Sequence, residues 1–193
     1  LTGASLTGTD AANYSLTAVN STTADITANS AALTGVFTVQ PSKVYDGTTS
    51  AQILSRSLSG VVSGDVVSLT GGSAAYDDKN VGTGKTVTLT GASLTGTDAA
   101  NYSLTAVNTT TADITPILTG PTGLIASFTV PASKVYDGTT SATVLTRSLS
   151  GVVTGDDVTL DGGAATYNNK NVGTGKTVTL TGASLTGTDA ANY

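Results

Sequence analysis

The sequence contains no cysteine, histidine, methionine, tryptophan or glutamate, so all 13 of its acidic residues are aspartates. Without cysteine the chain forms no disulfide, a composition compatible with a reducing compartment and also with a secreted bacterial protein that avoids thiols. Without histidine, cysteine and glutamate, the usual general bases and activated nucleophiles are missing. We therefore expect no enzymatic activity, no catalytic residue and no cofactor.

Charge is scarce as well. Charged residues make up 11% of the chain, the net charge is −5, and the eight lysines and arginines are scattered along it. Such a distribution lacks the basic patch that binds phosphate backbones. No apolar run approaches the roughly 20 residues that a membrane helix needs. Neither nucleic acid nor membrane insertion is expected for this segment.

The residues that dominate are threonine, serine, glycine, alanine, valine and aspartate. This set is poor in strong helix formers and rich in β-branched and turn residues. At 38% hydrophobic residues, the chain has enough apolar material to build cores. The composition predicts an all-β protein.

Internal repetition divides the chain. The phrase LTGASLTGTDAANY occurs at 1–14, 89–102 and 180–193, with shifts of 88 and 91 residues, and SKVYDGTTSA occurs at 42–51 and 133–142. The three extra residues lie in the second connector, and insertions collect in linkers. We expect the last strands of a preceding repeat in 1–27, a linker in 28–35, a complete repeat in 36–115, a linker in 116–126 and a repeat lacking its last strands in 127–193.

Alternating apolar and polar residues between glycine-, aspartate- and asparagine-rich turns predict short strands in the complete repeat. The expected strands cover residues 37–39, 43–45, 51–54, 66–69, 74–76, 85–90, 101–107 and 111–115. This density of strands is typical of an immunoglobulin-like β-sandwich. A β-helix would show a shorter period inside the repeat, which is absent. The expected architecture is a row of sandwiches joined end to end.

Three phrases of the repeat carry a resemblance: KVYDGTTSA near its start, VGTGKTVTLTGASLTGTDAANYSL later, and TTADITP at its end. They resemble the YDG-type repeats, and the related MBG-type repeats, of large secreted bacterial adhesins such as filamentous-haemagglutinin-like surface proteins. The YDG triplet stands at Tyr45-Asp46-Gly47 and again at Tyr136-Asp137-Gly138, where we expect a structural turn. The resemblance implies an extracellular or cell-surface array of β-sandwiches and supplies no ligand.

Two motifs could bind a ligand, and each also has a simpler structural interpretation. VGTGKT at 81–86 resembles the tail of a phosphate-binding loop, but Lys79 stands where that motif needs glycine, so a turn leading into a strand is favoured. The pair Asp77 and Asp78 could contribute to a structural calcium site. Its counterpart in the other repeat is Asn168 and Asn169, which favours solvated loop acids and no metal ligand.

One covalent possibility involves Lys43, Asn101 and Asp46. A lysine–asparagine isopeptide bond could join the first and penultimate strands of a sandwich, with the aspartate carrying protons. The simpler interpretation gives Asp46 a hydrogen-bonding role at its own turn.

Two functional hypotheses remain. In the first, the repeats are spacers or fibre units of an extracellular surface; in the second, loops such as 77–84 or 155–163 bind a host or matrix glycan. Tyrosines 45, 76, 102, 136 and 167 could serve as a sugar platform or close the rim of a core, which is their commoner use. The two repeats differ in those same loops, which favours the structural role.

The ends of the chain suggest how repeats meet. Residues 1–27 carry the strands that 126–193 lack, and burying each missing apolar side chain is worth about 1.5–3 kcal/mol. We expect either a window of a longer repetitive polypeptide, or a fibre unit in which residues 15–27 of one copy complete the sandwich of its neighbour. The expected partners are neighbouring repeats of the same or an identical chain.

Overall fold

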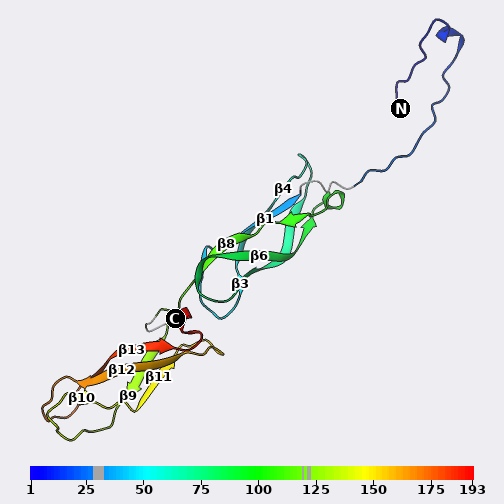
Figure 1. Cartoon of the computed structure of the whole chain (residues 1–193). Coiled ribbons are helices and arrows are strands. Elements are labelled where there is room, and N and C mark those ends of the chain that lie inside the picture. Colours follow the sequence, from blue (N-terminus) through cyan, green and yellow to red (C-terminus); the bar gives the residue numbers. More distant parts are fainter. Residues whose placement is uncertain (28–32, 119, 121–122) are drawn as a thin grey trace.

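The computed structural model describes residues 1–27, 33–118, 120 and 123–193. These residues form an all-β molecule that contains three short 3-10 helices and no α-helix. Two repeats, here called the first repeat (33–115) and the second repeat (124–193), lie end to end along one axis, and the N-terminal segment (1–27) extends away from them (Figure 1). No helix in the described part of the chain is long and apolar enough to cross a membrane.

The first repeat consists of two sheets, one with the strand order β2-β8-β6-β5-β3 and one with the order β4-β1-β7. The strands pair mostly antiparallel, but β7 runs parallel to β1 and β8 runs parallel to β2. Their bounds are β1 (Thr34–Val39), β2 (Ser42–Val44), β3 (Ser50–Ala51), β4 (Ile53–Ser59), β5 (Ser68–Tyr76), β6 (Gly82–Thr95), β7 (Ala106–Val107) and β8 (Thr110–Thr115).

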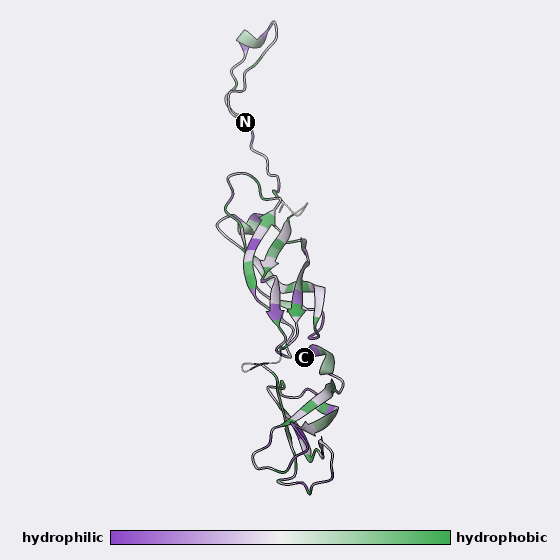
Figure 2. Cartoon of the chain, turned by 90° about the vertical axis from the view of Figure 1, so that its left-hand side faces the viewer, coloured by the Kyte–Doolittle hydropathy of each residue, from purple (hydrophilic) through white to green (hydrophobic). Residues whose placement is uncertain are grey.

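The core lies between these two sheets. Phe37 and Val39 of β1 pack with Val87 of β6 and Ile114 of β8, and the last two are 0% and 1% exposed. Apolar and polar residues alternate along the strands in Figure 2, as the period of a half-buried strand requires. The all-β prediction is confirmed, and the facing sheets are consistent with a β-sandwich, whereas the immunoglobulin-like strand arrangement is not established by these sheet orders.

Several expected boundaries differ from the structure. Of the strand expected over 101–107, only Ala106–Val107 form one, and the strand expected over 85–90 is part of the longer β6. Residues 68–69 and 74–76 belong to one strand, β5, because the ladder with β6 continues past Gly71 and Gly72, whereas residues 66–67 precede this strand. Both glycines adopt positive φ, yet the register with β6 is the same on both sides of them, so the strand continues through this pair without a turn. The linker expected at 28–35 lies partly outside the described residues, and β1 already begins at Thr34.

The second repeat has fewer strands. Its sheets are β10-β12-β13 and β11-β9, with bounds β9 (Ile125–Thr129), β10 (Ser141–Ala142), β11 (Thr146–Ser150), β12 (Thr159–Tyr167) and β13 (Val178–Thr186). The residues that correspond to β2 and to the first half of β6, 133–135 and 173–177, are not in strands. Residues 126–193 therefore do not form a closed, fully paired sandwich.

The difference follows from the place of β8 in the first repeat. This strand lies between β2 and β6 and pairs with both. Its six residues, TTADIT, occur once more at 22–27 in the N-terminal segment, where no strand forms and Ile26 is fully exposed. Within one copy of the chain, the two flanks that would receive this strand in the second repeat stay open. We call this region the open slot.

Candidate functional site

The most completely organised polar site lies at the joint between the two repeats. Asp156 of the second repeat, whose side chain is 2% exposed, accepts hydrogen bonds from the Tyr45 hydroxyl and the Lys79 Nζ of the first repeat, each at 2.8 Å. The Tyr193 hydroxyl of its own repeat donates a third bond, also at 2.8 Å. A buried carboxylate is tolerated only when it is paired and hydrogen-bonded. The first repeat supplies two of these three donors.

Backbone and aromatic contacts surround this carboxylate. The Tyr45 and Tyr193 rings meet edge to face with centroids 5.8 Å apart. Asn192, which is 4% exposed, accepts the Val81 amide on Oδ1 at 2.9 Å and the Ile117 amide on its backbone oxygen at 3.0 Å. The short helix η3 (Ala190–Asn192) holds this asparagine at the joint. Both sides of the interface are thus fixed by directional bonds.

Each residue of the triplet Tyr45-Asp46-Gly47 has its own physical role. Tyr45 crosses to Asp156, whereas Asp46 holds the turn by accepting from Lys43 Nζ at 2.7 Å and from the Thr48 amide at 2.9 Å. Gly47 has φ +75°, and a Cβ there would lie 2.8 Å from Cγ1 of Val153. Glycine is required at this position by the backbone conformation and by the close approach of the second repeat.

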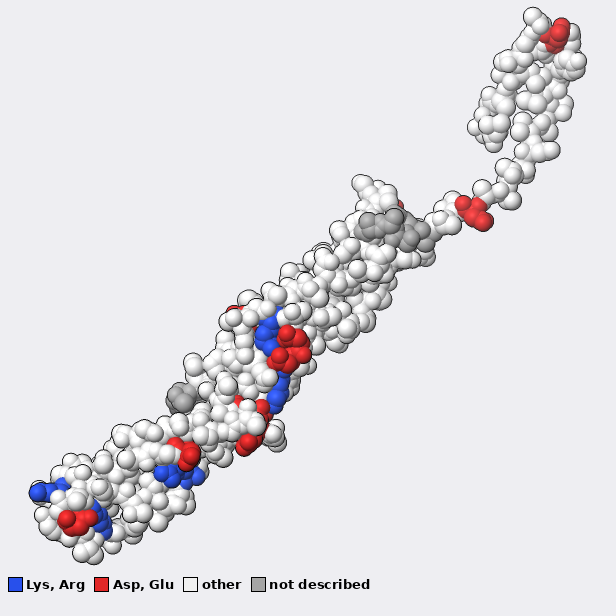
Figure 3. Space-filling view, in the orientation of Figure 1, with Lys and Arg blue, Asp and Glu red and all other residues white. Residues whose placement is uncertain are grey.

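The charges of the joint shift each other's pKa. Burial by itself raises the pKa of Asp156, but hydrogen bonds from Lys79, Tyr45 and Tyr193 hold it below its usual 3.8. Burial, together with the nearby carboxylate, raises the pKa of Tyr193 to about 12. The hydrogen bond to Asp156 raises the pKa of Lys79 above its usual range. Acidic and basic side chains lie side by side along this part of the molecule in Figure 3.

The residues proposed for an isopeptide bond are only partly brought together. Lys43 Nζ lies 2.7 Å from Asp46 Oδ1 and also donates to Thr48. Asn101 lies in the 3-10 helix η2 (Ala99–Asn101), where its amide donates to Asp98. Among the described residues, no hydrogen bond joins Asn101 to Lys43 or Asp46. The crosslink therefore stays a prediction.

The acidic pair considered for calcium contacts a lysine. Asp77 and Asp78 lie 3.1 and 2.8 Å from Lys85 Nζ, and in the second repeat Lys176 donates to Asn169 at 2.6 Å. The replacement of aspartate by asparagine thus preserves an acceptor for the lysine. The described residues contain no group of three or more side chains that could hold a metal ion.

The tyrosines of the two repeats differ in their exposure to solvent. Tyr45, Tyr76 and Tyr102 are at most 7% exposed, whereas Tyr136 is 58% exposed. In the first repeat the tyrosines therefore belong to the core and the joint and do not form an exposed platform. Sequence reasoning placed no role on Asp156 or Asn192, because their partners lie 111 residues away and each residue type also stands at the same place in the other repeat.

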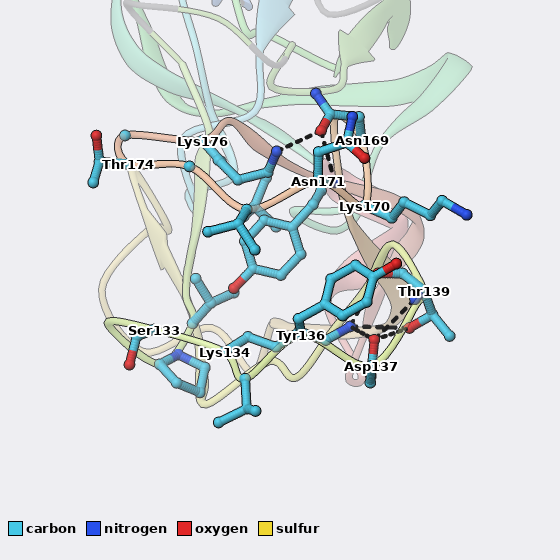
Figure 4. A pocket seen from close by; sticks show the side chains of 18 of the residues that line it. Ser133, Lys134, Tyr136, Asp137, Thr139, Asn169, Lys170, Asn171, Thr174 and Lys176 are labelled. Atoms are coloured by element: carbon cyan, nitrogen blue, oxygen red, sulfur yellow. Dashed lines mark hydrogen bonds and ion pairs between the residues drawn. The ribbon is translucent and has the colours of Figure 1, made fainter.

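The open slot forms the second site, a cavity of about 550 Å³ between residues 130–137 and 169–178 (Figure 4). Its floor is ordered by its own bonds: Asp137 accepts from Lys134 Nζ and from the Thr139 amide, both at 2.9 Å. The Lys134 hydrogen bond, with that of the Thr139 amide, lowers the pKa of Asp137 to about 2. The turn that carries the second YDG triplet is therefore already formed without its neighbouring strand.

Comparison with known families gives one match. The profile of the YDG domain matches residues 27–112 and 121–193. No curated protein and no solved structure matches the chain.

The pKa shifts at the joint predict a window of pH in which it stays closed. The pKa of Asp156 is lowered on folding, so its contribution is fully present above 3.8 and is lost as the pH falls through its lower folded value. The pKa of Tyr193 is raised, so its contribution is present below 10.0 and is lost as the pH rises through about 12.

Spin labels on Thr88→Cys and Thr179→Cys, two exposed strand positions in a chain without cysteine, would measure the distance across the joint. We expect a narrow distribution near neutral pH and a broad one once the pH falls below the pKa of Asp156 in the folded state, which is lower than 3.8. Circular dichroism of the same samples checks that the sheets persist. A distribution that stays narrow in acid while the sheets remain would contradict the role of Asp156.

Proposed function

Because the chain belongs to the YDG domain family, we propose that it is a structural segment of a secreted bacterial surface protein. In this role its repeats are stacked end to end and hold an extended stalk or extracellular fibre, without catalytic activity. The observation that supports this proposal is the closed joint, in which the first repeat supplies two of the three donors to the buried Asp156 carboxylate.

The joint resists bending for a physical reason. A change of angle between the repeats would break the bonds of Asp156 to Tyr45 and Lys79, and would separate Asn192 from the Val81 amide. Charge-assisted hydrogen bonds are short and directional, so they fix orientation as well as distance. Gly47 lies directly against Val153, so the two repeats cannot come closer together at this point. A spacer needs this stiffness because a freely jointed chain would fold back on itself.

The carboxylate itself can be tested with a pair of matched variants. Asp156→Asn should weaken the joint by about 1–3 kcal/mol, because its donors lose a charged acceptor, and should broaden the distance distribution between the two spin labels. Asp65→Asn is the control, since Asp65 is the counterpart in the first repeat and accepts from Tyr102 of the same repeat at 2.6 Å. Equal broadening in both variants, or none in either, would contradict the proposal.

A finer proposal concerns assembly by strand complementation. In the first repeat, Ile114 of β8 pairs with Lys43 on one side and with Gly82 on the other. The corresponding flanks of the open slot are Lys134 and Gly173. We propose that residues 22–27 of a second copy enter the slot in this register, with Ile26 buried as Ile114 is. In the first repeat three residues of β8 pair with β2 and four pair with β6, so the entering strand would gain hydrogen-bonding partners on both of its edges.

Hydrogen exchange tests this step. At high concentration the amides of residues 173–178 should become protected in the wild type, and Ile26→Asp should abolish the protection because it places a charge in the core. Thr23→Asp is the matched control, since its counterpart Thr111 is exposed, and it should retain protection. If protection does not depend on concentration, or is lost equally in both variants, strand complementation between copies is wrong.

The extracellular location is supported by the YDG family resemblance of both repeats, and the absence of thiols is compatible with it. Antibodies against the chain should label intact cells of the source bacterium without permeabilisation. Labelling that requires permeabilised cells would place the protein inside the cell and contradict this part of the proposal.

A further inference from the structure

The residues that form the joint occur twice in the chain, and the second set is undocked at the two outer ends of the molecule. We propose that a second copy of this chain docks its first repeat on the free end of the second repeat and rebuilds the same joint between copies. This inference rests on the proposed function as a segment of a stalk or fibre, and it names a second copy of the chain as the partner. The acceptor end carries Asp65, Asn101 and Tyr102, and the donor end carries Tyr136, Gly138, Lys170 and Val172.

The acceptor end is already arranged as it is in the internal joint. Tyr102 donates to Asp65 at 2.6 Å and accepts the Val62 amide at 3.0 Å. In the internal joint, Tyr193 likewise donates to Asp156 at 2.8 Å and accepts the Val153 amide at 2.7 Å. Asp65 has no lysine partner among the described residues, whereas Asp156 has Lys79. The acceptor end thus lacks only what the other repeat supplies.

The donor end shows the matching deficit. Lys170 alone among the eight basic residues makes no hydrogen bond or ion pair within the described part of the chain, whereas its counterpart Lys79 binds Asp156 and Asp189. Val172 is 88% exposed although its counterpart Val81 is half-buried, and Tyr136 is 58% exposed whereas Tyr45 is 3% exposed. These side chains face solvent where the internal joint covers their counterparts.

The space beside Gly138 is independent evidence that a neighbour is missing at the donor end. Gly138 has φ +80°, and a Cβ there would meet nothing within 4 Å, whereas the same atom at Gly47 would lie 2.8 Å from Val153. The turn itself is intact, since Lys134 and Asp137 pair at 2.9 Å as Lys43 and Asp46 do at 2.7 Å. Gly138 therefore leaves room for the close approach of a side chain such as that of Val153 at Gly47, and no residue in the described part of the same copy fills this space.

The partner is a second copy because one chain carries both halves of the contact. The two free ends lie at opposite extremes of the two stacked repeats (Figure 1), so a single copy cannot close on itself. A contact between different surfaces that does not close generates a linear filament. The docked copy also brings its N-terminal segment to the correct place, because residues 22–27 precede β1 as β8 precedes β9. Docking therefore presents the TTADIT strand beside the open slot.

Sedimentation velocity over a concentration series tests the contact with the full chain. The wild type should form head-to-tail oligomers, and Lys170→Ala should raise the dissociation constant by at least about tenfold, because it leaves the Asp65 carboxylate buried and unpaired. Asn168→Asp is the control, since it makes the same change in net charge at the donor end and installs the residue that the first repeat carries as Asp77. It should associate as the wild type does.

A charge exchange identifies the facing residues. Lys170→Asp and Asp65→Lys should each fail to self-associate, whereas an equimolar mixture of the two variants should associate again, since every contact in an alternating filament then joins opposite charges. Unfolding temperatures confirm that both variants are folded.

Three outcomes would overturn the docking proposal: a wild type that stays monomeric up to about 1 mM, variants that associate as the wild type does, or a mixture that does not recover. The spin-label distances across the internal joint are measured on dilute monomer, so a stiff internal joint without association would leave the array function intact. Association abolished by Ile26→Asp but unchanged by Lys170→Ala would assign assembly to the strand alone.

Discussion

The structure depends on one carboxylate shared between two repeats. Asp156 belongs to the second repeat, yet two of its three hydrogen-bond donors, Tyr45 and Lys79, come from the first. A buried charge of this kind contributes little net stability, because desolvation offsets much of the attraction. Its effect is on geometry, since only one arrangement satisfies all three donors. The relative orientation of the repeats is therefore specified by a polar contact, while the apolar cores stabilise each repeat separately.

The all-β fold and the repeats could be predicted from the sequence, whereas the contacts that join the two repeats could not. Repetition of whole phrases and the alternation of apolar residues predicted an all-β molecule and its division into repeats, because both follow from local periodicity. The pair Gly71 and Gly72 favours a turn by its local chemistry, yet it lies within β5 because the pairing with β6 continues on both sides of it. In the sequence, Lys79 stands out only because it replaces the glycine of a phosphate-binding motif. Its partner is 77 residues away, and no local pattern indicates such a pairing.

Identical residues in different surroundings show how far sequence reasoning can reach. Ile114 and Ile26 stand in the same hexapeptide, yet one is 1% exposed and the other fully exposed. Tyr45 and Tyr136 stand in the same triplet and differ in the same way. The difference lies in the neighbours. Ile114 lies in a strand between β2 and β6, and Tyr45 contacts Asp156 of the second repeat, whereas Ile26 and Tyr136 have no such neighbour in the described part of one copy. Each repeat of this kind carries the residues of a contact, and the structure shows in which repeat those residues are in contact.

The position of β8 in its sheet has a consequence for how such a chain is made. This strand comes last in the repeat, yet it lies between β2, near the beginning, and β6. A polypeptide that emerges amino-terminus first, from a ribosome or through an export channel, cannot close the five-stranded sheet until those last residues arrive. Each repeat would thus stay incompletely folded during its own synthesis or export and then close in one step. Folding on the far side of a channel would oppose backward sliding of the chain, one repeat at a time.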